Sequence, residues 1–173
     1  MTFKTRSENP HNICFGGPNM DTLFITANQG LYALDMPVKP APNVSPHRYT
    51  RDFGGLANLI QPGAKAQRLT TGFRPAQGPV ALPNGDFYFA DIYNHRILKW
   101  EFAKGDYQVV RENTRGGDGL AVMKDGSVLV CELTGKRFGK ITPDGDYEVI
   151  ADTFEGEALT GVNDVFIDRH GGI

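Results

Sequence analysis

Four polar residues stand at matching places in a repeated sequence pattern, and they are the first candidates for chemistry. They are Asn12, Gln77, Asp118 and Asn163, and the last three lie 41 and 45 residues apart. Amide and carboxylate oxygens are the ligands that hard cations such as Ca²⁺, Mg²⁺ and Mn²⁺ take in proteins, and they also hydrogen-bond polar small molecules. Chemistry is therefore expected at the start of each repeat.

The repeats share one plan of short apolar runs separated by turns. The first covers residues 77–91, the second covers 118–132, and the third begins at residue 163 and reaches the end of the chain at 173. A turn signal falls seven or eight residues into each copy, at Asn84-Gly85, Asp125-Gly126 and Gly171-Gly172. Alternating strands at a period of about 40–45 residues are typical of a β-propeller. The sequence therefore predicts an all-β propeller of four-stranded antiparallel blades, about three blades in this length.

The rest of the chain reads as one further blade portion and a linker. Residues 12–35 show strand-like runs around a turn, whereas residues 36–47 hold four prolines in twelve residues and predict a surface linker. Residues 55–62 predict a short helix or strand, and residues 66–70 predict a strand before the Gln77 repeat.

Composition excludes several classes of protein. The net charge is −2 and 22% of the residues are charged, with both signs interspersed, so nothing favours a nucleic-acid or membrane partner. No apolar run approaches the roughly 18 residues of a membrane span, and no signal peptide is evident, which predicts a cytoplasmic location. Cys14 and Cys131 lie in apolar runs and are expected to be buried free thiols rather than a disulfide.

Several motifs together resemble the gluconolactonase/regucalcin (senescence marker protein) family of six-bladed β-propellers. The resemblance covers about residues 9–36 and 55–173. It is carried by Gln77-Gly-Pro-Val, Phe89-Ala-Asp with Asn94-His-Arg-Ile-Leu-Lys-Trp, Cys131-Glu, Tyr147-Glu-Val-Ile-Ala-Asp, Gly161-Val-Asn-Asp-Val, and Asn12-Ile-Cys-Phe-Gly-Gly with Leu23-Phe-Ile-Thr. It implies about three blades of a six-bladed type.

The order of these motifs differs from that of the family. Residues 1–36 resemble the last blade, residues 37–54 form the Pro-rich linker, and residues 55–173 resemble the first two blades and the start of the third. The chain is then a circularly permuted fragment, a natural or engineered half-propeller that pairs with another chain, or an artefact of sequence assembly. Two such chains would supply about six blades, so a homodimer could close the ring.

The resemblance also implies a cation and a substrate. Family members bind one divalent cation (Ca, Mg, Mn or Zn) and use it to hydrolyse a lactone. By resemblance, Gln77 and Asn163 are metal ligands, with Gln77 in place of the family's glutamate, and Asp118 and Asn163 bind the sugar-lactone substrate. Capping of a strand is the structural alternative for Gln77 and Asp118. The family's catalytic aspartate comes from a blade that the chain lacks, so no catalytic residue is assigned.

The expected function is therefore metal-assisted hydrolysis of a sugar lactone. The alternative is a non-catalytic propeller fragment that acts as a binding or assembly module. Asp91 and Glu132 are interpreted as solvated or hydrogen-bonded turn carboxylates. The pairs His95-Arg96 and Lys136-Arg137 are interpreted as charge pairs between blades.

Overall fold

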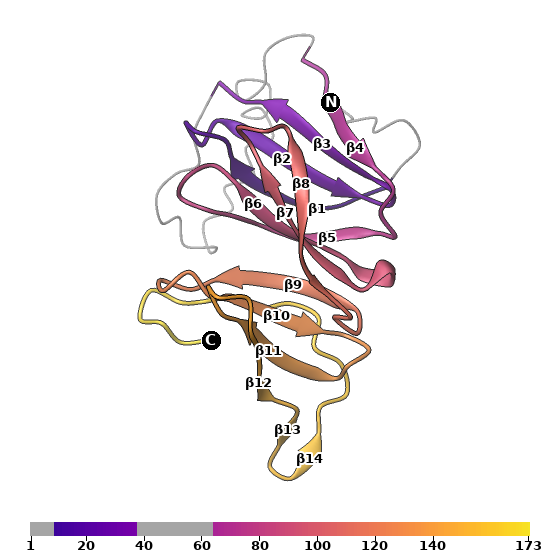
Figure 1. Ribbon diagram of the computed structural model, residues 1–173, viewed down its shortest axis with the longest axis vertical. Coiled ribbons are helices and arrows are strands. Elements are labelled where there is room, and N and C mark those ends of the chain that lie inside the picture. Colours follow the sequence, from indigo (N-terminus) through magenta and orange to yellow (C-terminus); the bar gives the residue numbers. More distant parts are fainter. Residues whose placement is uncertain (1–8, 38–63) are drawn as a thin grey trace, which may run out of the picture.

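The computed structural model describes residues 9–37 and 64–173, and this part of the chain is built from β-strands. Its main elements are three four-stranded antiparallel sheets, which follow one another along the longest axis of the molecule (Figure 1). The predicted all-β class and four-stranded blades are confirmed. The element expected at residues 55–62 lies outside the described residues.

The first sheet contains strands from both sides of the Pro-rich segment. Its order is β1-β2-β3-β4, with bounds Pro10–Gly16, Thr22–Ala27, Gly30–Asp35 and Gln67–Thr71. The ladder between β3 and β4 pairs Gly30 with Thr71 and Ala33 with Gln67. Segments on both sides of the predicted linker therefore share one sheet. The assignment of residues 1–36 to a last blade stays a prediction.

The second and third sheets are continuous in sequence. The second has the order β5-β6-β7-β8, with bounds Ala76–Ala81, Phe87–Asp91, Arg96–Glu101 and Asp106–Glu112. The third runs from β9 to β12, with bounds Gly117–Val122, Val128–Glu132, Arg137–Ile141 and Tyr147–Ala151. A 3-10 helix, η1 (Ile92–Asn94), joins β6 to β7. A small hairpin, β13 (Thr153–Phe154) and β14 (Glu157–Ala158), projects beyond the third sheet (Figure 1).

The predicted turns form in all three copies, and the first two connect the strands of a hairpin. In the first two copies, the N–H groups of Gly85 and Gly126 donate to the carbonyl oxygens of Leu82 and Met123, both over 3.0 Å. Both glycines have a φ near +90°, which is the left-handed conformation that such turns require and that other residues adopt at a cost. The same bond forms from Gly171 to Asp168, so the third copy makes its turn as well.

Apolar side chains fill the spaces between neighbouring sheets. Between the first and second sheets the buried residues are largely aromatic: Phe24, Leu31, Phe73, Ala76, Phe87, Phe89, Leu98 and Trp100. Between the second and third sheets they are mostly aliphatic: Ala90, Ile97, Leu120, Val128, Val130 and Ile141. Face-to-face packing of twisted sheets around such cores is what arranges blades in sequence.

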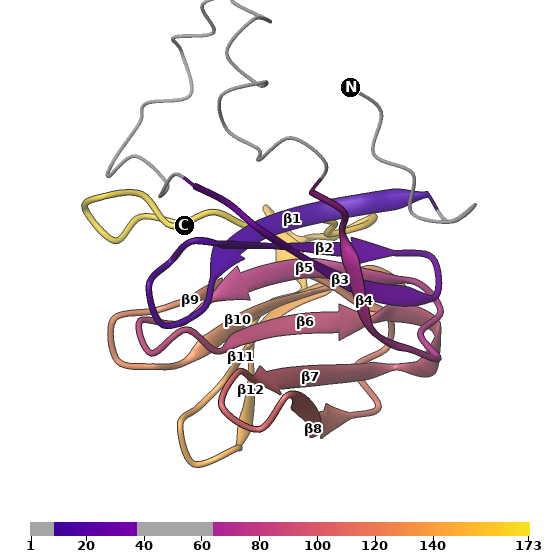
Figure 2. The same ribbon diagram turned by 90° about the horizontal axis from the view of Figure 1, so that it is seen from above.

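The first strand of each sheet lies beside the first strand of the next. Strand β1 contacts β5, and β5 contacts β9, whereas β4, β8 and β12 lie at the opposite edges of their sheets (Figure 2). We call β1, β5 and β9 the inner strands. Among residues 9–37 and 64–173, no helix is long and apolar enough to cross a membrane.

Candidate functional site

The four polar residues that begin the sequence repeats lie at one end of the inner strands. Asn12, Gln77 and Asp118 lie at the start of β1, β5 and β9, and Asn163 lies in the coil that follows the third sheet. We call this end of the sheets the upper rim. The inner strands begin one or two residues before the first three of these positions, at Pro10, Ala76 and Gly117.

Each inner strand carries one extra residue at the upper rim. The pairing of β5 with β6 shifts between Gln77 and Val80, and the pairing of β9 with β10 shifts next to Asp118. Strand β1 shows the same shift between Pro10 and Asn12. A bulge bends the strand and re-aims the side chain beside it. Because of the bulge, the side chains of Asn12, Gln77 and Asp118 do not follow the regular alternation between the two faces of the sheet.

The glycines that directly follow Gln77 and Asp118 in the sequence allow neighbouring segments at the upper rim to approach closely. A Cβ atom on Gly78 would lie 2.2 Å from the carbonyl oxygen of Asp118, and one on Gly119 would lie 2.5 Å from the Cα of Asp164. Because glycine lacks a Cβ, the backbones approach closely at both places. The Gln77-Gly and Asp118-Gly dipeptides thus place the polar residues that begin successive repeats on neighbouring segments.

Asp118 and Asn163 form the central contact of the candidate site. The Asn163 Nδ2 donates to the Asp118 Oδ2 over 2.9 Å, and the Asn163 carbonyl accepts from the Gly119 N–H, also over 2.9 Å. Asp118 is only 5% exposed. Burial and the nearby charge of Asp164 raise the pKa of Asp118 to about 6, partly opposed by His11. The site therefore holds a carboxyl group that changes charge in the range where enzymes work.

This raised pKa predicts a pH-dependent effect of Asp118→Asn on stability. The folded state holds the Asp118 proton more tightly than the unfolded state, so stability falls as pH rises from the unfolded pKa to about 6. Asparagine carries no charge at any pH. We expect its stability advantage over the wild type to be larger at about pH 7.5 than at about pH 4.5, by on the order of 2 kcal/mol. Urea denaturation at both pH values measures it, and Asp144→Asn, at an exposed carboxylate, is the control.

Gln77 presents a carbonyl oxygen without a partner. Its Oε1 is buried and accepts no hydrogen bond from the described residues. A buried acceptor left unpaired is destabilising and is commonly matched by a water, an ion or a ligand. In the described part of the chain, no group of three or more His, Cys, Asp or Glu residues could hold a metal ion. The amide and carboxylate oxygens of Gln77, Asp118 and Asn163 are of the kind that hard cations bind, but three such groups are fewer than the six to eight oxygens that Ca²⁺ takes.

The neighbours of the site have mainly local roles. The Asn12 Oδ1 accepts from the Ile13 N–H and the Asp164 Oδ1 accepts from the Val165 N–H, each a bond that stabilises the start of its segment. The sequence around His11 indicates no role for it, yet its charge influences Asp118 and its Nε2 lies 2.5 Å from the Asn28 Oδ1. Only the fold brings His11 to the upper rim.

Asp91 and Glu132 are hydrogen-bonded carboxylates, which is one of the two possibilities that the sequence left open. The other possibility is wrong, because both carboxylates are fully buried rather than solvated. Asp91 pairs with Arg96 over 2.5 Å, and Glu132 pairs with Arg137. Each pair joins the second and third strands of one sheet, so Arg96 and Arg137 do not form the expected pairs between blades. The signal in the sequence is a carboxylate that ends an apolar run with an arginine five residues later, in both copies.

The predicted free thiols are confirmed, and Cys131 is buried as expected, whereas Cys14 is only half-buried. Cys14 and Cys131 form no disulfide, and burial raises the pKa of both thiols to about 12. At neutral pH they stay protonated and are poor nucleophiles. Neither cysteine is therefore a candidate for catalysis.

A family model described as the SMP-30/gluconolactonase/LRE-like region matches residues 75–173. The chain belongs to this family. The matched region starts just before Gln77 and contains Asp118 and Asn163. Three of the four polar residues that begin the repeats therefore lie within the SMP-30/gluconolactonase region. Strands β1–β4 lie before it.

Solved structures agree with this membership. A putative gluconolactonase is similar at 30% identity and a TM-score of 0.60, over 68% of this chain and 41% of the other. A gluconolactonase from Xanthomonas campestris is 23% identical with a TM-score of 0.52, over 56% of this chain and 32% of its own. The calcium-binding protein regucalcin from Agrobacterium tumefaciens is 13% identical with a TM-score of 0.55, over 83% of this chain and 45% of its own.

The chain spans less than half the length of these propellers. The SMP-30/gluconolactonase fold of the described sheets therefore corresponds to part of a ring. A search of curated protein sequences gave no match.

Proposed function

We propose that this chain forms part of a lactonase of the gluconolactonase type, whose upper rim binds a sugar lactone for metal-assisted hydrolysis. The observation that carries the proposal is the bond between the Asp118 carboxylate and the Asn163 amide, together with the unpaired Gln77 carbonyl oxygen on the neighbouring inner strand. Convergent polar groups that include a carboxyl with a raised pKa are typical of a substrate site. Family membership supports a sugar lactone as the substrate class.

The three side chains would act on the ligand in different ways. The Gln77 Oε1 and the Asn163 Oδ1 accept hydrogen bonds from sugar hydroxyls or face a cation, and Asp118 accepts or donates according to its protonation state. A bound divalent cation would polarise the lactone carbonyl and lower the pKa of a water molecule. The remaining ligands and the acid–base group would come from blades outside this chain.

Lactone hydrolysis with Asn163→Ala tests the proposal. Glucono-lactone opening releases a proton, so base consumption at constant pH follows the rate in the presence of Ca²⁺, Mn²⁺ or Zn²⁺. In a ring completed by the other blades, we expect wild-type protein to accelerate the reaction and Asn163→Ala to lose at least about tenfold, as for the loss of a hydrogen bond at a substrate site. Gln108→Ala, on the exposed outer strand β8, is the control. Equal rates for wild type, Asn163→Ala and buffer would contradict the proposal.

Cation binding is expected to be weak and to improve when a charge is restored at position 77. A glutamine keeps a carbonyl oxygen but lacks the carboxylate charge on which hard dications depend. We expect Gln77→Glu to bind Ca²⁺ and Mn²⁺ about tenfold or more tightly than the wild type in calorimetric titrations. Gln108→Glu adds the same charge at an exposed position of β8. If both variants gain equally, net charge and not position 77 is responsible.

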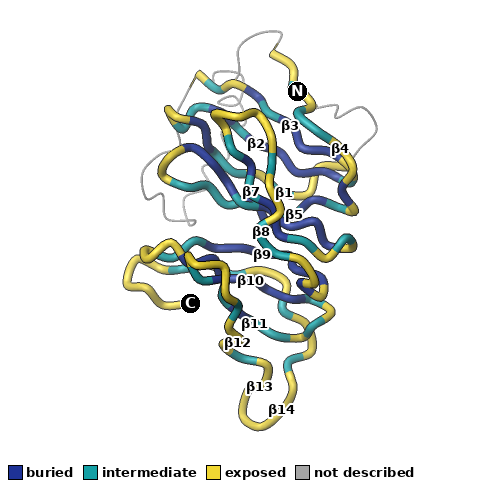
Figure 3. Tube along the Cα trace, viewed as in Figure 1, coloured by how far each residue is buried: buried dark blue, intermediate teal, exposed yellow. Residues whose placement is uncertain are grey.

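The alternative function is a binding or assembly module without catalysis. The segment that follows β14 is largely exposed along its trace (Figure 3). In it, Phe166 is 78% exposed and Ile173 is 62% exposed, and both line a hollow of about 500 Å³ together with Cys131 and Phe138. We propose that a second copy covers this face, because two copies of three blades match a ring of about six. A dimeric mass in solution with no bound metal and no hydrolysis would select this alternative.

A further inference from the structure

A second hollow lies on the upper rim, apart from Gln77, Asp118 and Asn163. It encloses about 390 Å³ and is lined by Asn28, Gln29, Phe73, Arg74, Pro75 and Tyr93. The turn between β2 and β3 supplies the first two residues, the connection from β4 to β5 supplies the next three, and η1 supplies Tyr93. Because Asp91 pairs with Ala76 and Asn12 pairs with Thr26, these loops lie at the end of the sheets where the inner strands begin.

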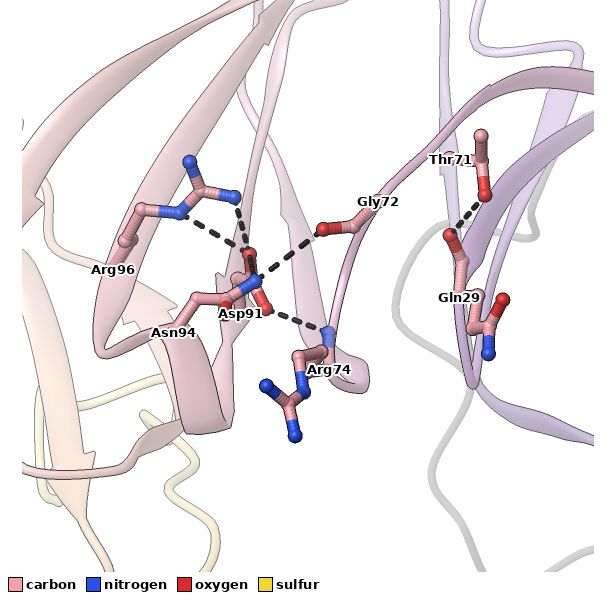
Figure 4. A network of polar contacts seen from close by, with 7 residues as sticks. All are labelled: Gln29, Thr71, Gly72, Arg74, Asp91, Asn94 and Arg96. Carbon is pink, nitrogen blue, oxygen red and sulfur yellow. Dashed lines mark hydrogen bonds and ion pairs between the residues drawn. The ribbon is translucent and has the colours of Figure 1, made fainter.

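Hydrogen bonds hold the walls of this hollow in place. The Gln29 carbonyl accepts from the Thr71 hydroxyl over 2.8 Å and from the Gly72 N–H over 2.9 Å, which ties the β2–β3 turn to the next connection (Figure 4). The buried Asp91 carboxylate accepts from the Arg74 N–H over 2.8 Å, and the Arg74 carbonyl accepts from the Tyr93 N–H over 2.7 Å. The backbone that carries Arg74 and Tyr93 is therefore fixed before any ligand arrives.

The side chains in this hollow offer a cation, a ring and an amide. The Arg74 guanidinium points away from Asp91 and has no hydrogen-bond or ion-pair partner in the described part of the chain (Figure 4). Tyr93 is 62% exposed. The Asn28 Oδ1 is engaged by His11, so its Nδ2 is the part of that side chain left to donate.

These groups match a small polyhydroxylated acid. A guanidinium binds a carboxylate through two parallel hydrogen bonds, and it does so best when its backbone is held still. An exposed tyrosine ring covers the apolar face of a sugar chain while its hydroxyl bonds to water or ligand. An amide Nδ2 donates to a hydroxyl oxygen.

We propose that the Arg74 hollow is a binding site for a sugar acid, with the ligand carboxylate on the Arg74 guanidinium, the hydroxyl chain against Tyr93 and one hydroxyl on Asn28. The choice of a sugar acid rests on the proposed function, because opening a sugar lactone yields such an acid. The hollow lies on the same rim as Gln77 and would receive the product after hydrolysis.

Calorimetric titration of gluconate into the wild type, Arg74→Gln and Arg74→Lys tests this site. Arg74→Gln keeps the backbone bond to Asp91, so the fold is expected to survive. We expect Arg74→Gln to weaken gluconate binding by about 10- to 100-fold, as for the loss of a charge-assisted pair, and Arg74→Lys to weaken it less. Arg68→Gln, at an exposed arginine of β4, should bind like the wild type. Glucose, which lacks the carboxylate, should bind at least about tenfold more weakly than gluconate.

Three results would overturn the assignment. They are equal gluconate binding by Arg74→Gln and the wild type, equal binding of inorganic sulfate and gluconate, and no saturable gluconate binding at all. Loss of binding in Gln77→Ala with retention in Arg74→Gln would place the acid at the other site, which overturns this inference and leaves the proposed function intact. Arg74-dependent gluconate binding without lactone hydrolysis would support this inference and remove the proposed function.

Discussion

Replacing Asp91 with alanine is expected to destabilise the protein by about 3–5 kcal/mol, the cost of breaking a buried ion pair from one side. The carboxylate is fully buried and accepts from the Arg74 N–H, the Asn94 Nδ2 and the Arg96 guanidinium. Alanine would leave these donors without their acceptor in a site closed to water. Urea denaturation of Asp91→Ala and the wild type measures the change.

Two further variants make this expectation specific. Asp91→Asn keeps the size of the side chain and one carbonyl oxygen, so it should lose less stability than Asp91→Ala. Glu101→Ala removes a carboxylate from a pair with the largely exposed Lys104 and should cost less than about 1 kcal/mol. Similar losses for Asp91→Ala and Glu101→Ala would show that burial of the Asp91 pair contributes nothing.

Gly78→Ala is expected to be the second most damaging change. The new Cβ would lie 2.2 Å from the Asp118 carbonyl oxygen, at a residue whose φ is +54°. The left-handed conformation costs alanine about 1–2 kcal/mol, and relieving the contact adds about 1–3 kcal/mol because two backbones must separate. The separation would also displace Asp118 from Asn163. A combined loss of about 2–5 kcal/mol in urea denaturation is expected.

Gly105 provides the matched control. Its φ is +65°, and a Cβ atom there meets nothing within 4 Å. Gly105→Ala should therefore show the conformational cost alone, about 1–2 kcal/mol. If Gly78→Ala cost no more than Gly105→Ala, the close approach of β5 and β9 at the upper rim would not matter for stability.

The sequence alone determined the features that depend on neighbouring residues. The repeat gave the all-β class, and its glycines marked turns at Gly85, Gly126 and Gly171, which adopt one φ near +90°. Turn chemistry is local, so it can be read from a few residues. The polar residue at the start of each inner strand was likewise visible, because the pattern repeats it.

Only the tertiary structure decided how distant residues meet. Asp91 and Arg96 were visible in the sequence, but the ladder between β6 and β7 places them in one sheet and buries the carboxylate. Asp118 owes its raised pKa to burial and to the charge of Asp164, while His11 acts in the opposite direction, and these three residues come from separate segments of the chain. Desolvation and charge depend on surroundings in space and not on order along the chain. Alternation and spacing show which residues can do chemistry, and packing between the sheets sets the protonation state in which they do it.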